Sequence, residues 1–261
     1  MADRYDEVEP HFRPENRAKV RRRLEGLAER TPSRDRMLDL GCGTGFLLSL
    51  AADLYGRLDG IDATPAMLAR VDLSPGNITV QQGVVEDLPF DTDTFDLVTA
   101  YSFIDHLADH RPMLAEAWRV LRPGGWLYID LIPNHEFFDA IHSLPPAPPE
   151  GYDAIVAREI NELVNHEAKL QEHFGIEPAD WRDAEPAKSG QKGFVADELR
   201  ADATAVGFTE AATRFEWFLG QAVVMHGTSM EAAATVDEHL QRLLPASARL
   251  YKYLVLTARK P

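Results

Sequence analysis

Short apolar runs separated by amphipathic stretches fill the first half of the chain, and this alternation predicts strands connected by helices. We expect strands at residues 37–40, 57–61, 78–80, 95–100 and 126–132. Helices are expected at residues 14–29, 46–52, 64–71 and 112–121. The fourth strand is almost entirely apolar, as expected for a parallel strand that is covered on both faces. The pattern is therefore typical of a doubly wound α/β fold.

This alternation is interrupted between residues 134 and 192. The segment contains a proline-rich stretch at 144–152 and a predicted helix at 154–174 with apolar residues on one face. The pattern then resumes with a helix at 194–208, a strand at 211–224, a helix at 229–244 and a final strand at 251–260. We therefore expect one core domain, made of residues 1–133 and 193–261, that carries an insertion at 134–192.

A glycine-rich turn follows the first strand and contains Gly41, Gly43 and Gly45. Glycine has no Cβ, so the backbone can turn sharply here and approach a ligand closely. Asp39 precedes the turn and would repel a pyrophosphate, whereas it suits an ammonium group. The GxGxG spacing, with Phe46 where the dinucleotide fingerprint has its third glycine, argues against a nicotinamide dehydrogenase.

Composition narrows the range of functions. The 261 residues suffice for a sizeable core, and 45% hydrophobic with 26% charged residues match ordinary globular usage. No apolar run approaches the roughly 20 residues that a membrane helix needs, and the N-terminus has no apolar segment of a secretory signal. We expect a cytoplasmic protein without a membrane partner. The net charge of −15 disfavours nucleic-acid binding.

Three segments, in order along the first 135 residues, resemble motifs of one family. The first is MLDLGCGTGFLL at 37–48, the second is QQGVVEDLPF at 81–90, and the third is RVLRPGG at 119–125. Together they resemble the class I S-adenosylmethionine (SAM) dependent methyltransferases. The resemblance implies a Rossmann-like seven-stranded sheet, mainly parallel with an antiparallel last strand. It also implies that the insertion is a helical lid over the substrate.

The resemblance and the residue chemistry together predict a SAM site. Asp62 ends the second strand, and its two carboxylate oxygens suit the two ribose hydroxyls. The alternative is that Asp62 only caps the following helix. Ala63 and Met67 would lie near the adenine ring.

The adenine contact departs from the family pattern. Relatives commonly have an aspartate directly after the glycine of the second motif, and this chain has Val84 there. Either Glu86 replaces that acid, or backbone groups around Val85 bind the adenine. Tyr5 resembles the aromatic residue of an N-terminal YD pair that closes over the cofactor in relatives, and Tyr101 ends the strand beside the expected methyl group.

A general base helps a weakly acidic methyl acceptor, and histidine titrates in the useful range. His106 follows the fourth strand and His135 follows the fifth, so both are candidates; either histidine could instead have a structural role. His166 and His173 fall in the expected lid helix, where solvent exposure is the alternative to lining a cavity.

We expect no metal site. His135, Glu136, Asp139 and His142 lie close together in the sequence, but their spacing matches no recognised ligand pattern. The single cysteine, Cys42, lies inside the glycine turn, where a small packing residue is expected rather than a catalytic thiol.

The leading hypothesis is a SAM-dependent methyltransferase that acts on an O, N or C atom of a small molecule. One alternative is an enzyme of this fold that uses bound SAM in a cyclisation or elimination. Another is a non-catalytic binding protein with a degenerate site, suggested only by Val84. The acceptor itself is not encoded in any recognisable motif, and a homodimer is left open as an assembly.

Overall fold

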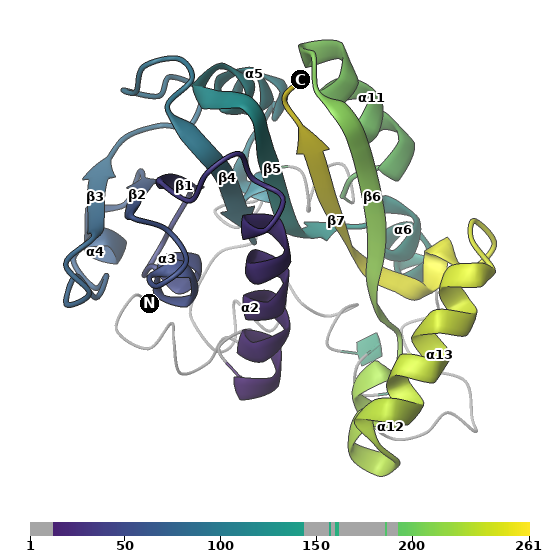
Figure 1. Cartoon of the computed structure of the whole chain (residues 1–261). Coiled ribbons are helices and arrows are strands. Elements are labelled where there is room, and N and C mark those ends of the chain that lie inside the picture. The colour runs from purple at the N-terminus through teal and green to yellow at the C-terminus, as the bar shows by residue number, and fades with distance from the viewer. Residues whose placement is uncertain (1–12, 144–156, 158–159, 162–185, 187–192) are drawn as a thin grey trace.

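The computed structural model describes residues 13–143, 157, 160–161, 186 and 193–261. Seven strands form one sheet in the order β3-β2-β1-β4-β5-β7-β6 (Figure 1). The strands are β1 (Arg36–Leu40), β2 (Arg57–Asp62), β3 (Ile78–Gln82), β4 (Phe95–Tyr101), β5 (Leu121–Pro133), β6 (Thr209–Phe218) and β7 (Tyr251–Arg259). β7 runs antiparallel to both β5 and β6, and the other neighbours are parallel. The predicted mainly parallel sheet with an antiparallel last strand is confirmed.

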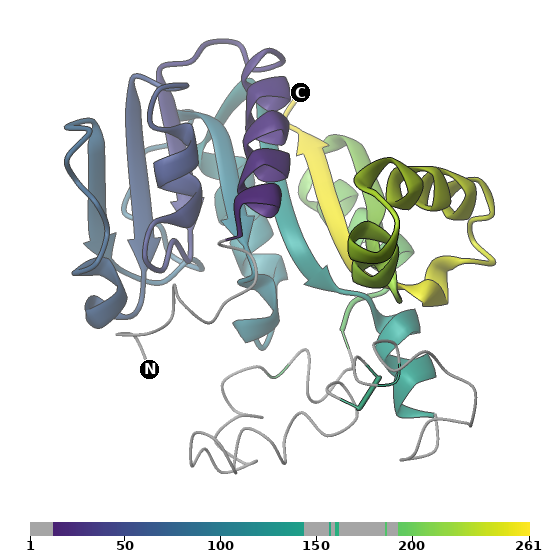
Figure 2. The ribbon, with the colours of Figure 1, turned by 90° about the horizontal axis from the view of Figure 1, so that it is seen from below.

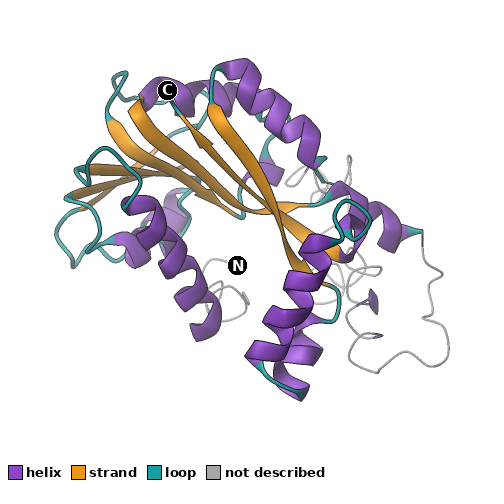
Figure 3. Ribbon diagram, turned by 45° about the vertical axis from the view of Figure 1, so that its right-hand side comes forward, coloured by secondary structure: helices purple, strands orange, loops and turns teal. Residues whose placement is uncertain are grey.

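Helices cover both faces of this sheet (Figure 3). The described helices are α2 (Pro14–Ala28), α3 (Phe46–Ala51), α4 (Pro65–Leu68), α5 (Arg111–Val120), α6 (His135–His142), α11 (Ala196–Val206), α12 (Gln221–Gly227) and α13 (Met230–Arg242), with short 3-10 turns η3 (Ile104–His106) and η4 (Ala248–Leu250). α2 and α3 contact each other on one face, and α5 and α11 contact each other on the opposite face (Figures 1 and 2). No described helix is both long and apolar enough to cross a lipid bilayer.

The N-terminal helix α2 follows from its sequence. Pro14 occupies its first turn, where a missing backbone N–H costs nothing. Val20, Leu24 and Leu27 are buried at spacings of one helical turn and join the core on the α3 side of the sheet. Because burying each such side chain contributes about 1.5–3 kcal/mol, this stripe is sufficient to fix the helix on the sheet.

The strand predicted at 211–224 is wrong beyond Phe218. Phe218 pairs with Tyr251, the first residue of β7, so the ladder has no further partner strand. The chain then turns at Gly220, whose φ of +83° favours glycine, and continues as α12. The helix predicted at 229–244 is confirmed as α13, whose N-cap Ser229 accepts a hydrogen bond from the Ala232 N–H.

Two boundaries near the third motif also differ from the prediction. α5 ends at Val120, and the strand expected from residue 126 begins already at Leu121, which pairs with Phe95. The Pro-Gly-Gly segment therefore forms an irregularity inside β5, with Gly124 at φ +82°, rather than a separate turn before it.

Only part of the expected lid is described. α6 begins directly after β5, and its side chains Phe137, Phe138 and Ile141 pack with Ile160 in a small separate hydrophobic cluster. The proline-rich stretch at 144–152 lies outside the described residues, as does the helix expected at 154–174 apart from residues 157, 160 and 161.

Candidate active site

The glycine turn connects β1 to α3 at the carboxyl edge of the sheet. Gly41, Gly43 and Gly45 have φ values of +62°, +52° and +86°, which favour glycine. A Cβ on Gly41 would lie 2.0 Å from the Cδ2 atom of Phe103, so the Phe103 ring packs directly on this residue. A Cβ on Gly43 would meet no described atom within 4 Å. Gly43 thus faces open space and can approach a ligand.

Asp62 holds this turn in place. One carboxylate oxygen accepts a hydrogen bond from the Gly43 N–H at 2.9 Å, and the other accepts one from the Thr64 N–H at 2.8 Å. The alternative that Asp62 caps the next helix is not supported, because the N-cap residue of α4 is Thr64 and the Asp62 bond reaches the Thr64 N–H ahead of the helix. Each oxygen has a second acceptor position, so the two bonds leave acceptor capacity for ribose hydroxyls.

Asp39 is buried beneath the turn, with 2% of its surface exposed. Its Oδ1 accepts a hydrogen bond from the Thr99 hydroxyl at 2.7 Å, and it forms no ion pair with a described residue. Burial raises the pKa of Asp39 to about 7, and the nearby charge of Asp62 acts in the same direction. A cationic group bound above the turn would favour the ionised carboxylate.

The segments expected around adenine lie side by side at the ends of β2 and β3. The Gly83 N–H donates to the Asp62 carbonyl at 3.1 Å, and the Gln82 amide donates to the Ala63 carbonyl at 3.1 Å. Val84 is 54% exposed, an unusual state for valine, and Ala63 is exposed as well. This apolar surface suits a flat ring. Of the remaining predicted contacts, Met67 is half-buried, Val85 buried and Glu86 exposed.

Tyr101 ends β4 and packs on the first residue of the helix that follows the glycine turn. Its ring centroid lies 4.8 Å from that of Phe46. Its hydroxyl accepts a hydrogen bond from the Asn16 side chain of α2 at 2.8 Å, and burial raises its pKa. The next residue, Ser102, has a φ of +50°, which is strained for a residue with a Cβ. The predicted cofactor contact Tyr5 lies outside the described residues.

The two predicted bases have different surroundings. His106 ends η3, is exposed, and lies with its ring centroid 6.2 Å from that of Phe103. His135 begins α6 and lines a cavity of about 290 Å³ beside α11, which His106 does not line. Each histidine therefore stays a candidate base with its own surroundings.

Sequence reasoning missed an acid beside His106. Asp105 is 5% exposed, and its Oδ1 has no hydrogen-bond partner among the described residues. The sequence signal for this acid was its position between the apolar Ile104 and a histidine, shortly after a buried strand.

A second missed feature is a buried charged network between α2 and the sheet. Arg23 forms ion pairs with Asp130, at 2.8 Å, and with Glu216, while Lys19 also contacts Glu216. The Tyr128 hydroxyl donates to Asp130. Both acids are at most 4% exposed, and burial lowers the pKa of Lys19 to about 8. Single acids within the apolar stretches of β5 and β6 were the available signal.

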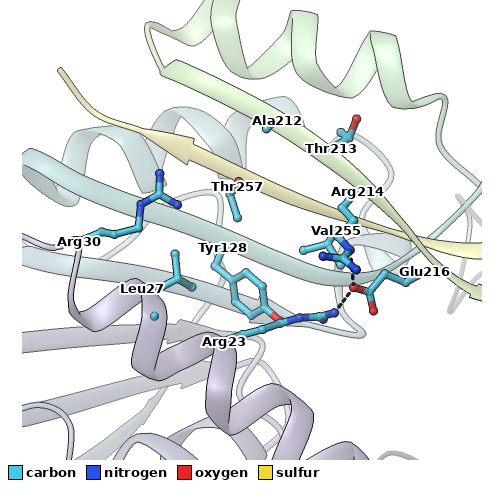
Figure 4. Close-up of a pocket in the computed structure, with 11 residues that line it drawn as sticks. Arg23, Leu27, Arg30, Tyr128, Ala212, Thr213, Arg214, Glu216, Val255 and Thr257 are labelled. Carbon is cyan, nitrogen blue, oxygen red and sulfur yellow. Dashed lines mark hydrogen bonds and ion pairs between the residues drawn. The ribbon is translucent and has the colours of Figure 1, made fainter. Parts of the chain in front are cut away.

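This network borders a larger cavity of about 390 Å³ between α2 and strands β5, β7 and β6 (Figure 4). Its described lining includes the arginines Arg23, Arg30 and Arg214. All three have partners: Arg23 and Arg214 reach Glu216, and the Arg30 guanidinium lies 3.6 Å from the centre of the Trp126 ring.

The described residues support neither metal binding nor a reactive thiol. Among the described residues, no group of three or more histidine, cysteine or acidic side chains is arranged to hold a metal. Cys42 is buried, and burial raises the pKa of its thiol. Its Sγ would lie 2.8 Å from a Cβ on Gly60, so the thiol packs tightly against β2. Such an environment suits a packing residue.

Comparisons with known proteins agree with this geometry. Residues 38–129 match the family model described as a methyltransferase domain. A probable S-adenosylmethionine-dependent methyltransferase of Mycolicibacterium smegmatis is 34% identical over 122 residues, 47% of this chain and 47% of that protein. The 27-O-demethylrifamycin SV methyltransferase of Amycolatopsis mediterranei is 28% identical over 254 residues, 92% of this chain and 83% of that protein.

The fold is also that of solved methyltransferase structures. A SAM-dependent methyltransferase from Archaeoglobus fulgidus has a TM-score of 0.56 at 17% identity, covering 94% of each chain. The chain spans about half the length or less of the curated relatives that it matches at 34–35% identity. Residues 38–129 are thus similar to the methyltransferase domain family, and the sheet order agrees with the fold of the solved SAM-dependent methyltransferase.

The residues of the site fit SAM. Gly43 is open toward a ligand, Asp62 retains acceptor positions, and the buried Asp39 has no cationic partner among the described residues. Exposed Val84 and Ala63 offer an apolar surface. A ligand with a cation, a pair of hydroxyls and a flat ring would satisfy all of these groups.

Proposed function

We propose that this protein transfers the methyl group of SAM to a small molecule. The observation that carries the proposal is the glycine turn, held by Asp62 through the Gly43 N–H and lying over the buried Asp39. The 27-O-demethylrifamycin SV methyltransferase, whose match extends over 92% of this chain, supports a small-molecule acceptor. The net charge of −15 also favours such an acceptor over a nucleic acid.

In this proposal the chain mainly positions the reacting groups. Bound SAM supplies a methyl group that is activated by a positively charged sulfur. Asp62 would accept hydrogen bonds from the ribose hydroxyls of SAM. The carboxylate of Asp39 would attract the positively charged part of SAM above the glycine turn, and Val84 would flank the adenine ring. Fixing two reactants in the correct orientation can by itself supply much of the rate acceleration. His106 and His135 are the proposed bases for an acceptor that must lose a proton.

We also propose that residues 134–192 cover the acceptor. The described part of this segment supports the idea, because α6 starts directly after β5 and buries Phe137 and Phe138 in a cluster of its own. Because these side chains pack apart from the main hydrophobic core, the amino-acid sequence of this segment can vary without disturbing that core.

Calorimetric titration with SAM and with S-adenosylhomocysteine tests the proposal. We expect Asp62→Ala to weaken both affinities at least a hundredfold, because two hydrogen bonds to a charged carboxylate contribute about 1.5–3 kcal/mol each. Asp72→Ala is a matched control, because the exposed Asp72 accepts a hydrogen bond from the Ser74 N–H at 2.9 Å in the same local geometry and forms no hydrogen bond with a described residue of the glycine turn. No binding by the intact protein would refute the proposal, as would equal effects of both variants.

Mass spectrometry of reactions with candidate acceptors then separates methyl transfer from the alternative chemistry. Methyl transfer adds one methyl group to the acceptor and produces S-adenosylhomocysteine in equal amount. A cyclisation or elimination would leave SAM unconsumed.

A further inference from the structure

The first turn of α2 contacts the helix that follows the glycine turn and the strand beside that turn. The Asn16 side-chain amide donates a hydrogen bond to the Tyr101 hydroxyl of β4 at 2.8 Å. The Arg17 guanidinium lies 3.5 Å from the Ser49 hydroxyl of α3 and 5.7 Å from the centre of the Phe46 ring. The helix near the N-terminus is therefore connected directly to the elements that form the expected SAM site.

Tyr101 lies next to the glycine turn. β1 and β4 run parallel, with Leu40 paired to Ala100. The next residues, Gly41 and Tyr101, therefore lie side by side where the two strands end. In doubly wound sheets, ligands bind at this edge, between the strands from which the sheet extends in opposite directions. These strands are β1 and β4 in this sheet order.

The hydrogen bond from Asn16 fixes the far end of the Tyr101 ring. The ring packs on Phe46, the first residue of α3, with 4.8 Å between centroids, and Tyr101 is buried. Loss of a partner is costly for a buried hydroxyl, so this bond favours one position of the ring. Asn16 is itself held in place, because α2 buries Val20 and Leu24 in the core.

We propose that Asn16 is a positioning residue of the SAM site, an inference that rests on the proposed function. Asn16 holds the Tyr101 hydroxyl, and the Tyr101 ring holds Phe46, which directly follows the glycine turn. The turn is therefore kept in one conformation before the cofactor arrives. A preorganised site binds more tightly, because less conformational freedom is lost on binding. Asn16 would thus act on SAM through Tyr101.

Calorimetric titration of SAM and S-adenosylhomocysteine into the full chain measures the effect of Asn16→Ala. We expect both affinities to fall about fivefold, the effect of losing one ordinary hydrogen bond. Alanine forms helices more readily than asparagine, so the substitution leaves α2 in place.

Arg21→Ala is the matched control. Arg21 also connects α2 to the α3 region, since it donates to the Leu50 carbonyl at 2.6 Å and to the Asp53 carboxylate at 2.9 Å. These contacts lie at the end of α3 that is remote from the glycine turn. The control variant should therefore leave both affinities unchanged, whatever stability it loses.

Tyr101→Phe tests whether Asn16 acts through Tyr101. The phenylalanine ring can still pack on Phe46 but has no hydroxyl for Asn16 to bind, so adding Asn16→Ala should change the affinities no further. Tyrosine labelled with ¹³C at Cζ provides an NMR signal for Tyr101, identified by its loss in Tyr101→Phe. We expect S-adenosylhomocysteine to shift this signal equally in the wild type and in Arg21→Ala, and to shift it less in Asn16→Ala.

The proposal is overturned if Asn16→Ala weakens binding equally with and without the Tyr101 hydroxyl, or if S-adenosylhomocysteine binds without shifting the Tyr101 signal. Equal losses of affinity for Asn16→Ala and Arg21→Ala would also overturn it, because they would show a general effect of loosening α2. Wild-type affinity in Asn16→Ala refutes the positioning role alone. If the wild type binds neither ligand, the proposed function is refuted.

Discussion

The glycine turn and the charged network under α2 are both built on buried acids, yet they differ in how those acids are balanced. In the network, Asp130 and Glu216 are matched by Arg23 and Lys19. Under the glycine turn, the side-chain hydrogen-bond partner of Asp39 among the described residues is the Thr99 hydroxyl. A buried charge without an opposite charge is costly. The acids of the network are therefore balanced by cations within the protein, whereas the carboxylate of Asp39 has no such cation among the described residues, as the proposed binding of a cationic cofactor requires.

The two regions also differ in the sequence separation between the residues that they join. Gly43 and Asp62 are 19 positions apart, whereas Lys19 and Glu216 are 197 positions apart. The first contact lies within one strand-helix-strand unit. The second joins the N-terminal helix to the edge strand, so it forms only when the whole sheet has formed. We expect the network to support global stability and the glycine turn to support ligand binding.

The largest effect is expected from Glu216→Ala. The substitution removes a buried acid that both Lys19 and Arg23 contact, and breaking an ion pair to a buried charge from one side costs up to about 3–5 kcal/mol. Urea unfolding measures this loss. Glu210→Ala on the same strand is the control, because Glu210 is 51% exposed and its pairing with Arg259 should contribute about 1 kcal/mol or less. Equal losses for both variants would show that the network does not brace α2.

The next effect concerns the pH dependence of stability, which Asp39 should control. Its pKa is raised in the folded protein to about 7, so its contribution to stability is fully present below its unfolded pKa and is lost as pH rises through about 7. A shift of this size corresponds to a loss of about 4 kcal/mol between pH 4 and pH 8. Asp39→Asn should remove this loss and make the ligand-free protein more stable at pH 8.

Unfolding of the wild type and Asp39→Asn at pH 4 and pH 8, without ligand, gives the comparison. The effect of Asp39 is the difference between the two proteins in how their free energies of unfolding change with pH, because all other titrating groups are present in both proteins. The same variant should weaken SAM binding, since it lacks the charge that favours a cation. If Asp39→Asn binds SAM as tightly as the wild type does, the claim that the acid under the glycine turn supports ligand binding is wrong.

A smaller effect should distinguish two glycines of one turn. Gly41→Ala combines a strained left-handed backbone with a collision against the Phe103 ring, for a loss of stability of about 3 kcal/mol. Gly43→Ala has the strain without the collision and should cost about 1 kcal/mol. Thermal unfolding measures both losses, and SAM titration should show weakened binding by Gly43→Ala as well. A larger stability loss for Gly43→Ala would contradict the described packing of Phe103.

Much of the fold could be read from the sequence where the signal is local. Apolar runs gave the parallel strands, and Pro14 with a repeat of one helical turn gave α2. The end of β6 could not be read in this way, because Phe218 and the residues after it are similarly apolar. That strand stops where its partner β7 begins at Tyr251, which is a property of the pairing between distant segments.

The glycine turn and the position of Asp62 at the end of the next strand were predictable from the sequence, because both lie within one short unit whose geometry its residues dictate. Which distant groups meet was not predictable in this way. The tertiary structure placed His110 against Asp202, 92 positions away, and placed His135 in the described lining of the cavity beside α11, which does not include His106. Such contacts depend on how helices pack across the sheet, and no local pattern of residues encodes that packing.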